Sequence, residues 1–106
     1  MFRVFTTKEF DNRFERIDES EKKRVRKILH QLRERGPQIG KPLKVPYFRE
    51  KKFGSKRLYF LIYKNFMVVL AIALSDKKEQ QETINKIISR FDFYKEFILD
   101  KLRKVT

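Results

Sequence analysis

The sequence predicts an α+β domain, with an N-terminal strand and a helical hairpin packed on a small, mainly antiparallel twisted sheet of about four strands, and a C-terminal helix. The 106 residues suffice for one domain with one core, and 41% of them are hydrophobic. Phe66 to Leu74 is a run of nine apolar residues. This run is too short for a membrane span, which needs about 20 residues, and it fits a central strand buried on both faces. Segments with helical spacing of apolar residues precede and follow it.

The first third of the chain is expected to form a strand over residues 1–6 and a helical hairpin over 7–35. Thr6 is predicted to cap the first helix, with Glu9 completing a capping box. Glycine and proline at the end of this segment stop the second helix. The apolar positions of the hairpin follow helical spacing within each of its two helices: Phe10, Phe14 and Ile17, then Val25, Ile28, Leu29 and Leu32.

The sheet is expected over residues 46–75, after a Gly/Pro-rich loop from Pro37 to Pro46, with tight turns at Gly54-Ser55 and Lys64-Asn65. Between these turns, alternation assigns Leu58, Phe60 and Ile62 to the face under the helical hairpin. The opposite face is predicted to be partly open to solvent, because it carries polar side chains: Arg57, Tyr59 and Tyr63, together with Leu61.

The C-terminal helix is expected over residues 76–104, with Asp76 as its cap and Glu79 three residues later. Its apolar stripe leaves two alternatives open, one long helix or a helix with a break near Asp92. A tail with one apolar side needs a surface to cover, and that surface is the sheet, a second copy of the chain or a partner. The apolar stripe consists of Ile84, Ile87, Ile88, Phe91, Tyr94, Ile98, Leu102 and Val105.

The positive charge is concentrated in one segment. The whole chain carries a net charge of +13, and the span from Lys22 to Lys64 holds 15 Lys and Arg against 2 acids, so the rest of the chain is neutral. Such a block is typical of a protein that binds a polyphosphate or an acidic partner. A generic solvated surface of high pI is the alternative.

Several classes of site are not indicated by the sequence. There is no cysteine, so disulfides and cysteine metal sites are excluded, and a reducing cytoplasmic location is expected. The N-terminus has no apolar stretch typical of a signal peptide, and no P-loop, Rossmann, HExxH or EF-hand pattern occurs. No metal and no cofactor are therefore expected. His30, the only histidine, is interpreted as structural or solvated.

The order of elements and several short motifs resemble the RelE/ParE toxin superfamily. The matching residues, which together extend over the chain up to about Ile88, are Gly40-Lys41-Pro42-Leu43, Gly54, Arg57, Tyr59 or Phe60, Tyr63 and the strand Val68-Val69-Leu70-Ala71-Ile72. The resemblance implies a small basic α+β protein, the RelE-like toxin of a toxin–antitoxin pair. It further implies a metal-independent endoribonuclease, an mRNA interferase that cuts ribosome-bound mRNA and inhibits translation.

The chemistry implied by this resemblance needs a proton acceptor, cations around the phosphate and a proton donor. Arg57 matches the strand arginine of the superfamily and is predicted to hold the scissile phosphate. Lys51 and Lys52, across the glycine turn, are expected near the same phosphate, where one of them would act as base. Glu50 is a competing base, and the alternative role for its carboxylate is an ion pair with a neighbouring cation. Lys77 is the candidate for a further catalytic cation.

Further cations and one aromatic ring are predicted to bind RNA around this site: Lys41, Lys44, Arg49, Lys56, Tyr59 and Lys78. The sequence after Leu74 departs from the superfamily, since no His, Arg or nearby Tyr follows the last strand. This departure leaves two alternatives open, a non-catalytic or diverged member that binds RNA or an acidic antitoxin-like protein, and a ParE-like gyrase inhibitor.

The partners implied are mRNA, the ribosome and a cognate antitoxin, with no membrane. Two assemblies are considered for this chain, a homodimer and a toxin–antitoxin hetero-oligomer. The basic edge of the sheet has a purely structural interpretation as well, because charged side chains on a strand edge discourage aggregation.

Overall fold

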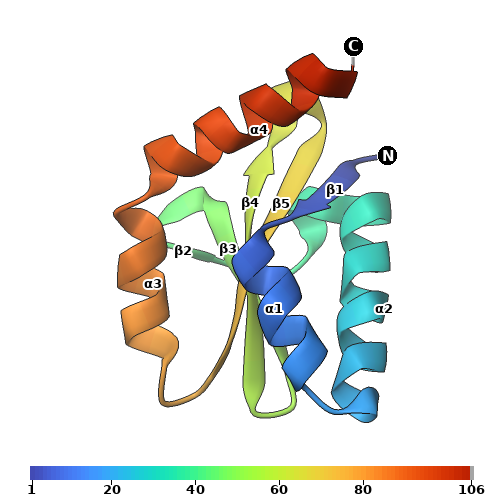
Figure 1. Cartoon of the computed structure of the whole chain (residues 1–106), viewed down its shortest axis with the longest axis vertical. Helices are drawn as coiled ribbons and strands as arrows, with labels where there is room; N and C mark the ends of the chain where they lie inside the picture. Colours follow the sequence, from blue (N-terminus) through green and yellow to red (C-terminus); the bar gives the residue numbers. More distant parts are fainter. Residues whose placement is uncertain (106) are drawn as a thin grey trace.

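The computed structural model describes residues 1–105, in which one twisted sheet carries helices on both of its faces (Figure 1). Short 3₁₀ turns at Gly36–Gln38 and Lys64–Phe66 interrupt the connections between these elements. In chain order the helices and strands are β1 (Arg3–Thr6), α1 (Lys8–Arg16), α2 (Glu19–Arg35), β2 (Lys41–Leu43), β3 (Val45–Phe53), β4 (Lys56–Tyr63), β5 (Val68–Asp76), α3 (Gln80–Ile88) and α4 (Phe91–Val105).

The strand order is β1-β5-β4-β3-β2, with β1 parallel to β5 and the other pairs antiparallel. The apolar run therefore lies in the interior of the sheet, and every residue from Val68 to Leu74 is buried, as predicted. The sheet has five strands where about four were expected. The additional strand, β2, lies in the segment predicted to be a loop, since Lys41 pairs with Glu50 of β3.

The helical hairpin covers one face of the sheet, where Leu58, Phe60 and Ile62 share a core with α1 and α2, as predicted. The cap of α1 is Thr7 and not Thr6, because Thr6 is still part of β1 and pairs with Ala71 of β5. The hydroxyl of Thr7 accepts a hydrogen bond from the Phe10 amide at 3.0 Å and donates one to the Ile72 carbonyl at 2.6 Å. This residue thus ties the start of α1 to the central strand.

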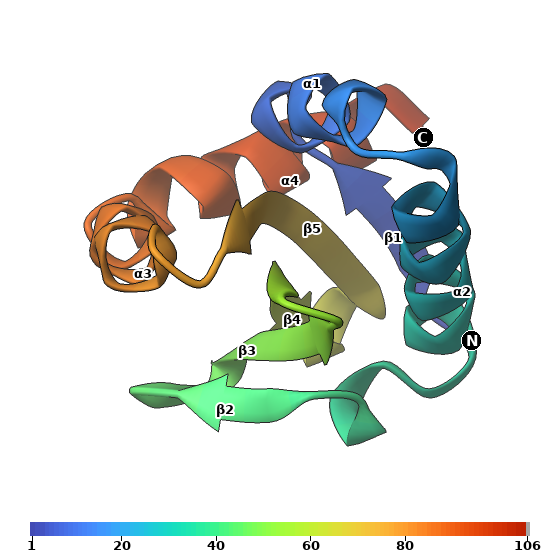
Figure 2. The same cartoon turned by 90° about the horizontal axis from the view of Figure 1, so that it is seen from below.

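The second face of the sheet is covered by α3 and α4 (Figure 2), so the prediction of a partly open face was wrong. Tyr59 is 0% exposed and Arg57 is 7% exposed. The cause is the apolar C-terminal stripe, whose side chains Ile84, Ile87, Tyr94 and Ile98 pack on this face of the sheet. Of the three surfaces considered for the C-terminal tail, the sheet of the same chain is the one that it covers.

The C-terminal segment forms two helices and not one, and they separate at Ser89 and Arg90, just before the break considered near Asp92. The first helix begins later than expected. Asp76 and Glu79 do form the reciprocal pair of a capping box, but Asp76 still belongs to β5, and α3 starts at Gln80. The turn after β4 is longer than the predicted turn at Lys64-Asn65. Met67 adopts a left-handed conformation with φ 54°, so β5 begins at Val68.

Acid is expected to weaken the contact between α1 and α3. Arg13 Nη2 donates to Glu79 Oε1 at 2.8 Å, and this hydrogen bond lowers the pKa of Glu79 to about 2. Since the folded pKa lies below the ordinary value of 4.5, this contribution is complete above pH 4.5 and is lost as the pH falls toward 2. The slope of unfolding free energy against pH in this window should therefore flatten in Glu79→Gln. An unchanged slope in urea titrations would contradict the assignment.

Candidate functional site

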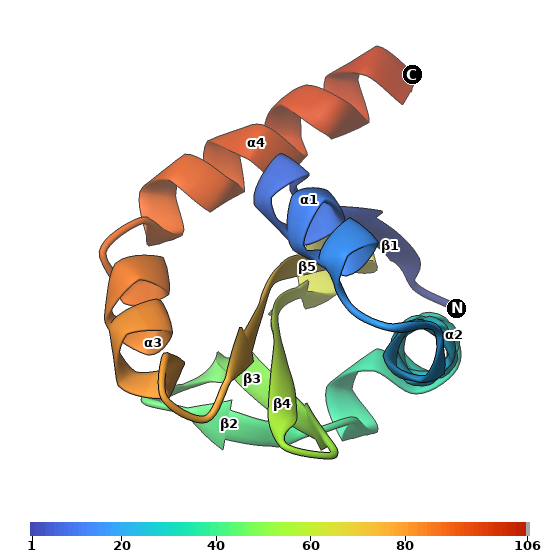
Figure 3. The same ribbon diagram turned by 60° about the horizontal axis from the view of Figure 1, so that its bottom comes forward.

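Most of the predicted site residues lie at one end of the sheet, where the β3–β4 hairpin lies beside the end of β5 (Figure 3). Gly54 makes the hairpin tight, with a φ of 61°. The two-residue turn then fixes the register of this hairpin, so that Lys52 is paired with Arg57, and the separate pairing of β4 with β5 places Lys56 opposite Asp76. The connection that follows β5 brings two further exposed cations to the same end, Lys77 and Lys78.

A buried carboxylate and a buried guanidinium form the centre of this site. Glu50 is 1% exposed, and its Oε1 lies 4.0 Å from Arg57 Nε. Neither Glu50 Oε2 nor Arg57 Nε has a hydrogen-bond partner among the described residues. Lys41 Nζ, 3.9 Å from Oε2, adds a second cation. Burying charges without full hydrogen bonding is costly, so this cluster is a candidate for function more than for stability.

A phenol lies next to this ion pair. Tyr59 faces Glu50 in the strand register, and its hydroxyl forms a hydrogen bond of 2.8 Å with the Ser75 hydroxyl. Burial raises the pKa of Tyr59, which keeps the phenol protonated near neutral pH. From α3, the Gln80 amide donates to Glu50 Oε1 at 3.3 Å and closes the cluster. A possible base, a cation and a possible proton donor thus lie next to one another in this cluster.

Two of the predicted residues lie elsewhere than expected. Lys51 is paired with Leu58, on the face toward α2, because neighbours along a strand point to opposite faces. The prediction that it lies beside Arg57 was therefore wrong. Arg49 has its guanidinium occupied by carbonyl groups, with Nε donating to Ile39 at 2.9 Å and Nη2 to Gly40 at 2.7 Å.

Two of the remaining predicted cations, Lys52 and Lys56, belong to the hairpin beside the cluster, whereas Lys44 lies at the other end of the β2–β3 pair. Lys52 is exposed beside Arg57. Lys56 forms an ion pair with Glu21 at 3.5 Å, and Lys44 is exposed with a φ of 64° in the connection from β2 to β3. Among the described residues, no group of three or more acidic or histidine side chains is placed to hold a metal ion. None of the helices in the described chain has the length and apolarity that a membrane crossing requires.

Sequence reasoning did not include Ser75 and Gln80 among the site residues. A signal for Ser75 was the end of the apolar run, since Ser75 directly follows Leu74 and pairs with Arg57 of β4. No local pattern indicates that Gln80 reaches Glu50, because that contact depends on the path of α3 across the sheet.

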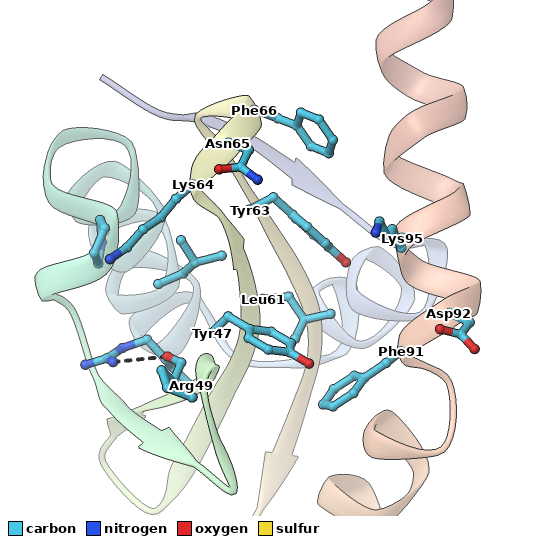
Figure 4. A pocket seen from close by; sticks show the side chains of 13 residues that line it. Tyr47, Arg49, Leu61, Tyr63, Lys64, Asn65, Phe66, Phe91, Asp92 and Lys95 are labelled. Atoms are coloured by element: carbon cyan, nitrogen blue, oxygen red, sulfur yellow. Dashed lines mark hydrogen bonds between the residues drawn. The ribbon is translucent and has the colours of Figure 1, made fainter.

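A second concavity, of about 700 Å³, lies at the opposite end of β4 (Figure 4). Its walls come from the start of β3, the end of β4 and the first turn of α4. The lining is rich in aromatic side chains and was not predicted from the sequence: Tyr47, Tyr63, Phe66 and Phe91.

The sequence matches no family model and no curated protein significantly. The arrangement of elements does match solved structures. A mutant of the E. coli toxin RelE in the free state superposes with a TM-score of 0.71, over 84% of this chain and 96% of that chain, at 17% identity. The chain has the RelE fold. A chain of the intact E. coli RelBE toxin–antitoxin complex matches with a TM-score of 0.64 at 18% identity, over 72% of this chain and 96% of that one.

The RelBE2 toxin–antitoxin complex of Mycobacterium tuberculosis gives a TM-score of 0.63 at 16% identity, over 72% of this chain and 98% of the matched chain. The likeness therefore covers nearly the whole of each RelE-like chain. At these identities it shows the RelE fold, and the residues of this chain have to carry any argument about chemistry.

Proposed function

We propose that this protein is a RelE-like toxin of a toxin–antitoxin pair and an endoribonuclease that cuts mRNA on the ribosome. The observation that carries the proposal is the buried, incompletely hydrogen-bonded pair of Glu50 and Arg57 beside the phenol of Tyr59. The likeness to RelE structures and the cations beside the cluster support the proposal.

The chemistry divides among three side chains. Glu50 takes the proton of a ribose 2′-hydroxyl, and the 2′-oxygen attacks the adjacent phosphorus. Arg57 stabilises the negative charge on the phosphate, for which its planar fork is suited. Tyr59 gives its proton to the leaving 5′-oxygen as the P–O5′ bond breaks. The products are a 2′,3′-cyclic phosphate and a free 5′-hydroxyl, and solvent then returns Glu50 and Tyr59 to their starting states.

Access to this cluster requires movement of α3. Gln80 covers Glu50, and the ion pair of Arg13 with Glu79 fastens the start of the same helix to α1. In this closed arrangement a phosphate does not reach Arg57, which is 7% exposed. The proposal therefore includes a displacement of α3 when mRNA binds.

Purified protein added to translating ribosomes is expected to cut the mRNA and leave 2′,3′-cyclic phosphate ends. Loss of the base in Glu50→Gln, or of the acid in Tyr59→Phe, should lower the cleavage rate by about 10²- to 10⁴-fold. Glu9→Gln serves as a matched control, since Glu9 is an exposed acid on α1 that pairs with Lys86, outside the cluster. Thermal unfolding of each variant separates loss of chemistry from loss of fold. Full cleavage by both variants would overturn the assignment of roles.

A cognate antitoxin is part of the proposal. The E. coli and M. tuberculosis structures that this chain resembles are named as toxin–antitoxin complexes. The block of positive charge between Lys22 and Lys64 suits an acidic partner segment. Accumulation of the protein in cells should then require co-expression of an acidic protein encoded next to it.

A second candidate function is a non-cleaving, RNA-binding member of the same fold. The burial of Arg57 against Glu50 favours it, together with the absence of His, Arg or nearby Tyr after Leu74. Intact mRNA in the ribosome assay, with salt-sensitive RNA binding by the cations beside the cluster, would select this candidate over the nuclease. DNA breaks in a topoisomerase assay would instead indicate a ParE-like gyrase inhibitor.

A further inference from the structure

The aromatic concavity at the far end of β4 forms a groove because β3 does not pair with the last residues of β4. The pairing of β3 with β4 starts at Phe48 and Leu61, so Ile62 and Tyr63 have no β3 partner on that side. Pro46 and Tyr47 line the groove on the β3 side, and the first turn of α4 lines it on the other side (Figure 4). The result is a cleft with side walls from two separate parts of the chain.

The walls of this groove are aromatic. Tyr47 of β3 lies against Phe91 of α4, with ring centroids 5.6 Å apart, and Tyr63 of β4 lies against Phe66 at 6.5 Å. Tyr47 is 45% exposed and Phe66 is 36% exposed. Exposed aromatic faces on both sides of one cleft are typical of a binding surface for a flat apolar ligand.

The charge of the groove is positive. Lys64 and Lys95 are exposed, and no ion pair engages either of them within residues 1–105. Arg49 adds positive potential, although its guanidinium is bound to carbonyl groups, and Asp92 is the one acid of the lining. The Tyr63 hydroxyl is buried at the wall and has no hydrogen-bond partner among the described residues.

We infer that this groove binds an unstacked base of single-stranded RNA, with phosphates of the same strand held by Lys64 on one side and Lys95 on the other. Aromatic faces beside mobile cations bind such nucleotides with little dependence on sequence. An acidic peptide would use the lysines but would leave the ring faces of Tyr47 and Phe66 without a stacking partner. The groove thus fits a nucleotide better than it fits a peptide.

This inference rests on the proposed function, because RNA is the ligand in both. From Arg57 to Tyr63 the chain advances six positions along β4, which corresponds to about 20 Å. The two sites are therefore close enough for one RNA strand to reach both. The groove acts as a positioning site for the strand and takes no part in the bond cleavage itself.

The test is an NMR titration of the intact protein with adenosine 5′-monophosphate and with ribose 5-phosphate. Stacking predicts that the nucleotide shifts the resonances of Tyr47 and Phe66 and binds at least about 10-fold more tightly than the sugar phosphate. Tyr47→Ala should weaken nucleotide binding by about 5- to 100-fold. Phe93→Ala is the matched control, because Phe93 is an aromatic residue of α4 that is 56% exposed and does not line the groove.

Three results would overturn the inference: equal affinity for the two ligands, no effect of Tyr47→Ala, or shifts in the groove with an oligoglutamate peptide only. These results are distinguishable from failure of the proposed function. Cleavage on ribosomes without nucleotide binding in the groove removes this inference alone. Nucleotide binding in the groove without cleavage leaves the inference in place and removes the nuclease.

Discussion

Replacing Glu50 by leucine is expected to lower the free energy of unfolding by about 3–5 kcal/mol. The substitution leaves the Arg57 guanidinium 7% exposed, with its nearest carboxylate gone. A charge without a partner in the interior keeps its full desolvation cost. Urea unfolding at pH 7 measures the effect, and Glu15→Leu, at an exposed acid of α1, should change the stability by no more than about 0.5 kcal/mol.

The double variant Glu50→Leu with Arg57→Met makes this prediction specific. Removing both charges together eliminates the unpaired cation, so the double variant should be more stable than Glu50→Leu alone and near the stability of the unaltered protein. A double variant as unstable as the single one would show that the two side chains do not compensate each other. The same variant should be inactive on mRNA, which separates the role of the pair in stability from its role in function.

Gly40→Ala is expected to destabilise the protein by about 3 kcal/mol or more. Gly40 has a φ of 72°, and a Cβ atom there would collide with the backbone carbonyl of Glu50. The colliding atom belongs to the sheet and not to a flexible side chain, so β2 would have to move away from β3. That movement would also disturb the hydrogen bond from Arg49 Nη2 to the Gly40 carbonyl.

Gly54→Ala is the matched control for this prediction. Its φ of 61° imposes a similar backbone cost, but its Cβ would approach only the end of the Arg24 side chain, which can move. We expect a loss of about 1–2 kcal/mol at Gly54. Thermal unfolding of the two variants compares them directly, and equal losses would mean that the close approach at Gly40 has no energetic weight.

The sequence predicted the parts of the fold that depend on local periodicity. The run of nine apolar residues from Phe66 to Leu74 predicted a central strand buried on both faces, and its residues from Val68 onward are buried. The stripe of the helical hairpin and the Gly54 turn were equally clear. Faces assigned by alternation, such as that of Leu58 and Phe60, were correct because they follow from strand geometry alone.

Contacts between distant segments could not be predicted in the same way. Arg57 and Tyr59 were expected to be partly open to solvent. The C-terminal helices cover them instead, and the path of these helices depends on tertiary packing that no local pattern shows. For the same reason the contact of Gln80 with Glu50 was missed. Strand β2 was missed because three residues that include a proline carry almost no strand signal.

The pairing of the first strand with the fifth has a consequence for the timing of synthesis. The Thr7 hydroxyl binds a carbonyl 65 positions later in the chain, and β1 joins the sheet beside β5. An emerging chain therefore cannot place its amino-terminal strand until about two-thirds of it has left the exit tunnel. A polypeptide that damaged translation would stay harmless to the ribosome producing it until late in its own manufacture.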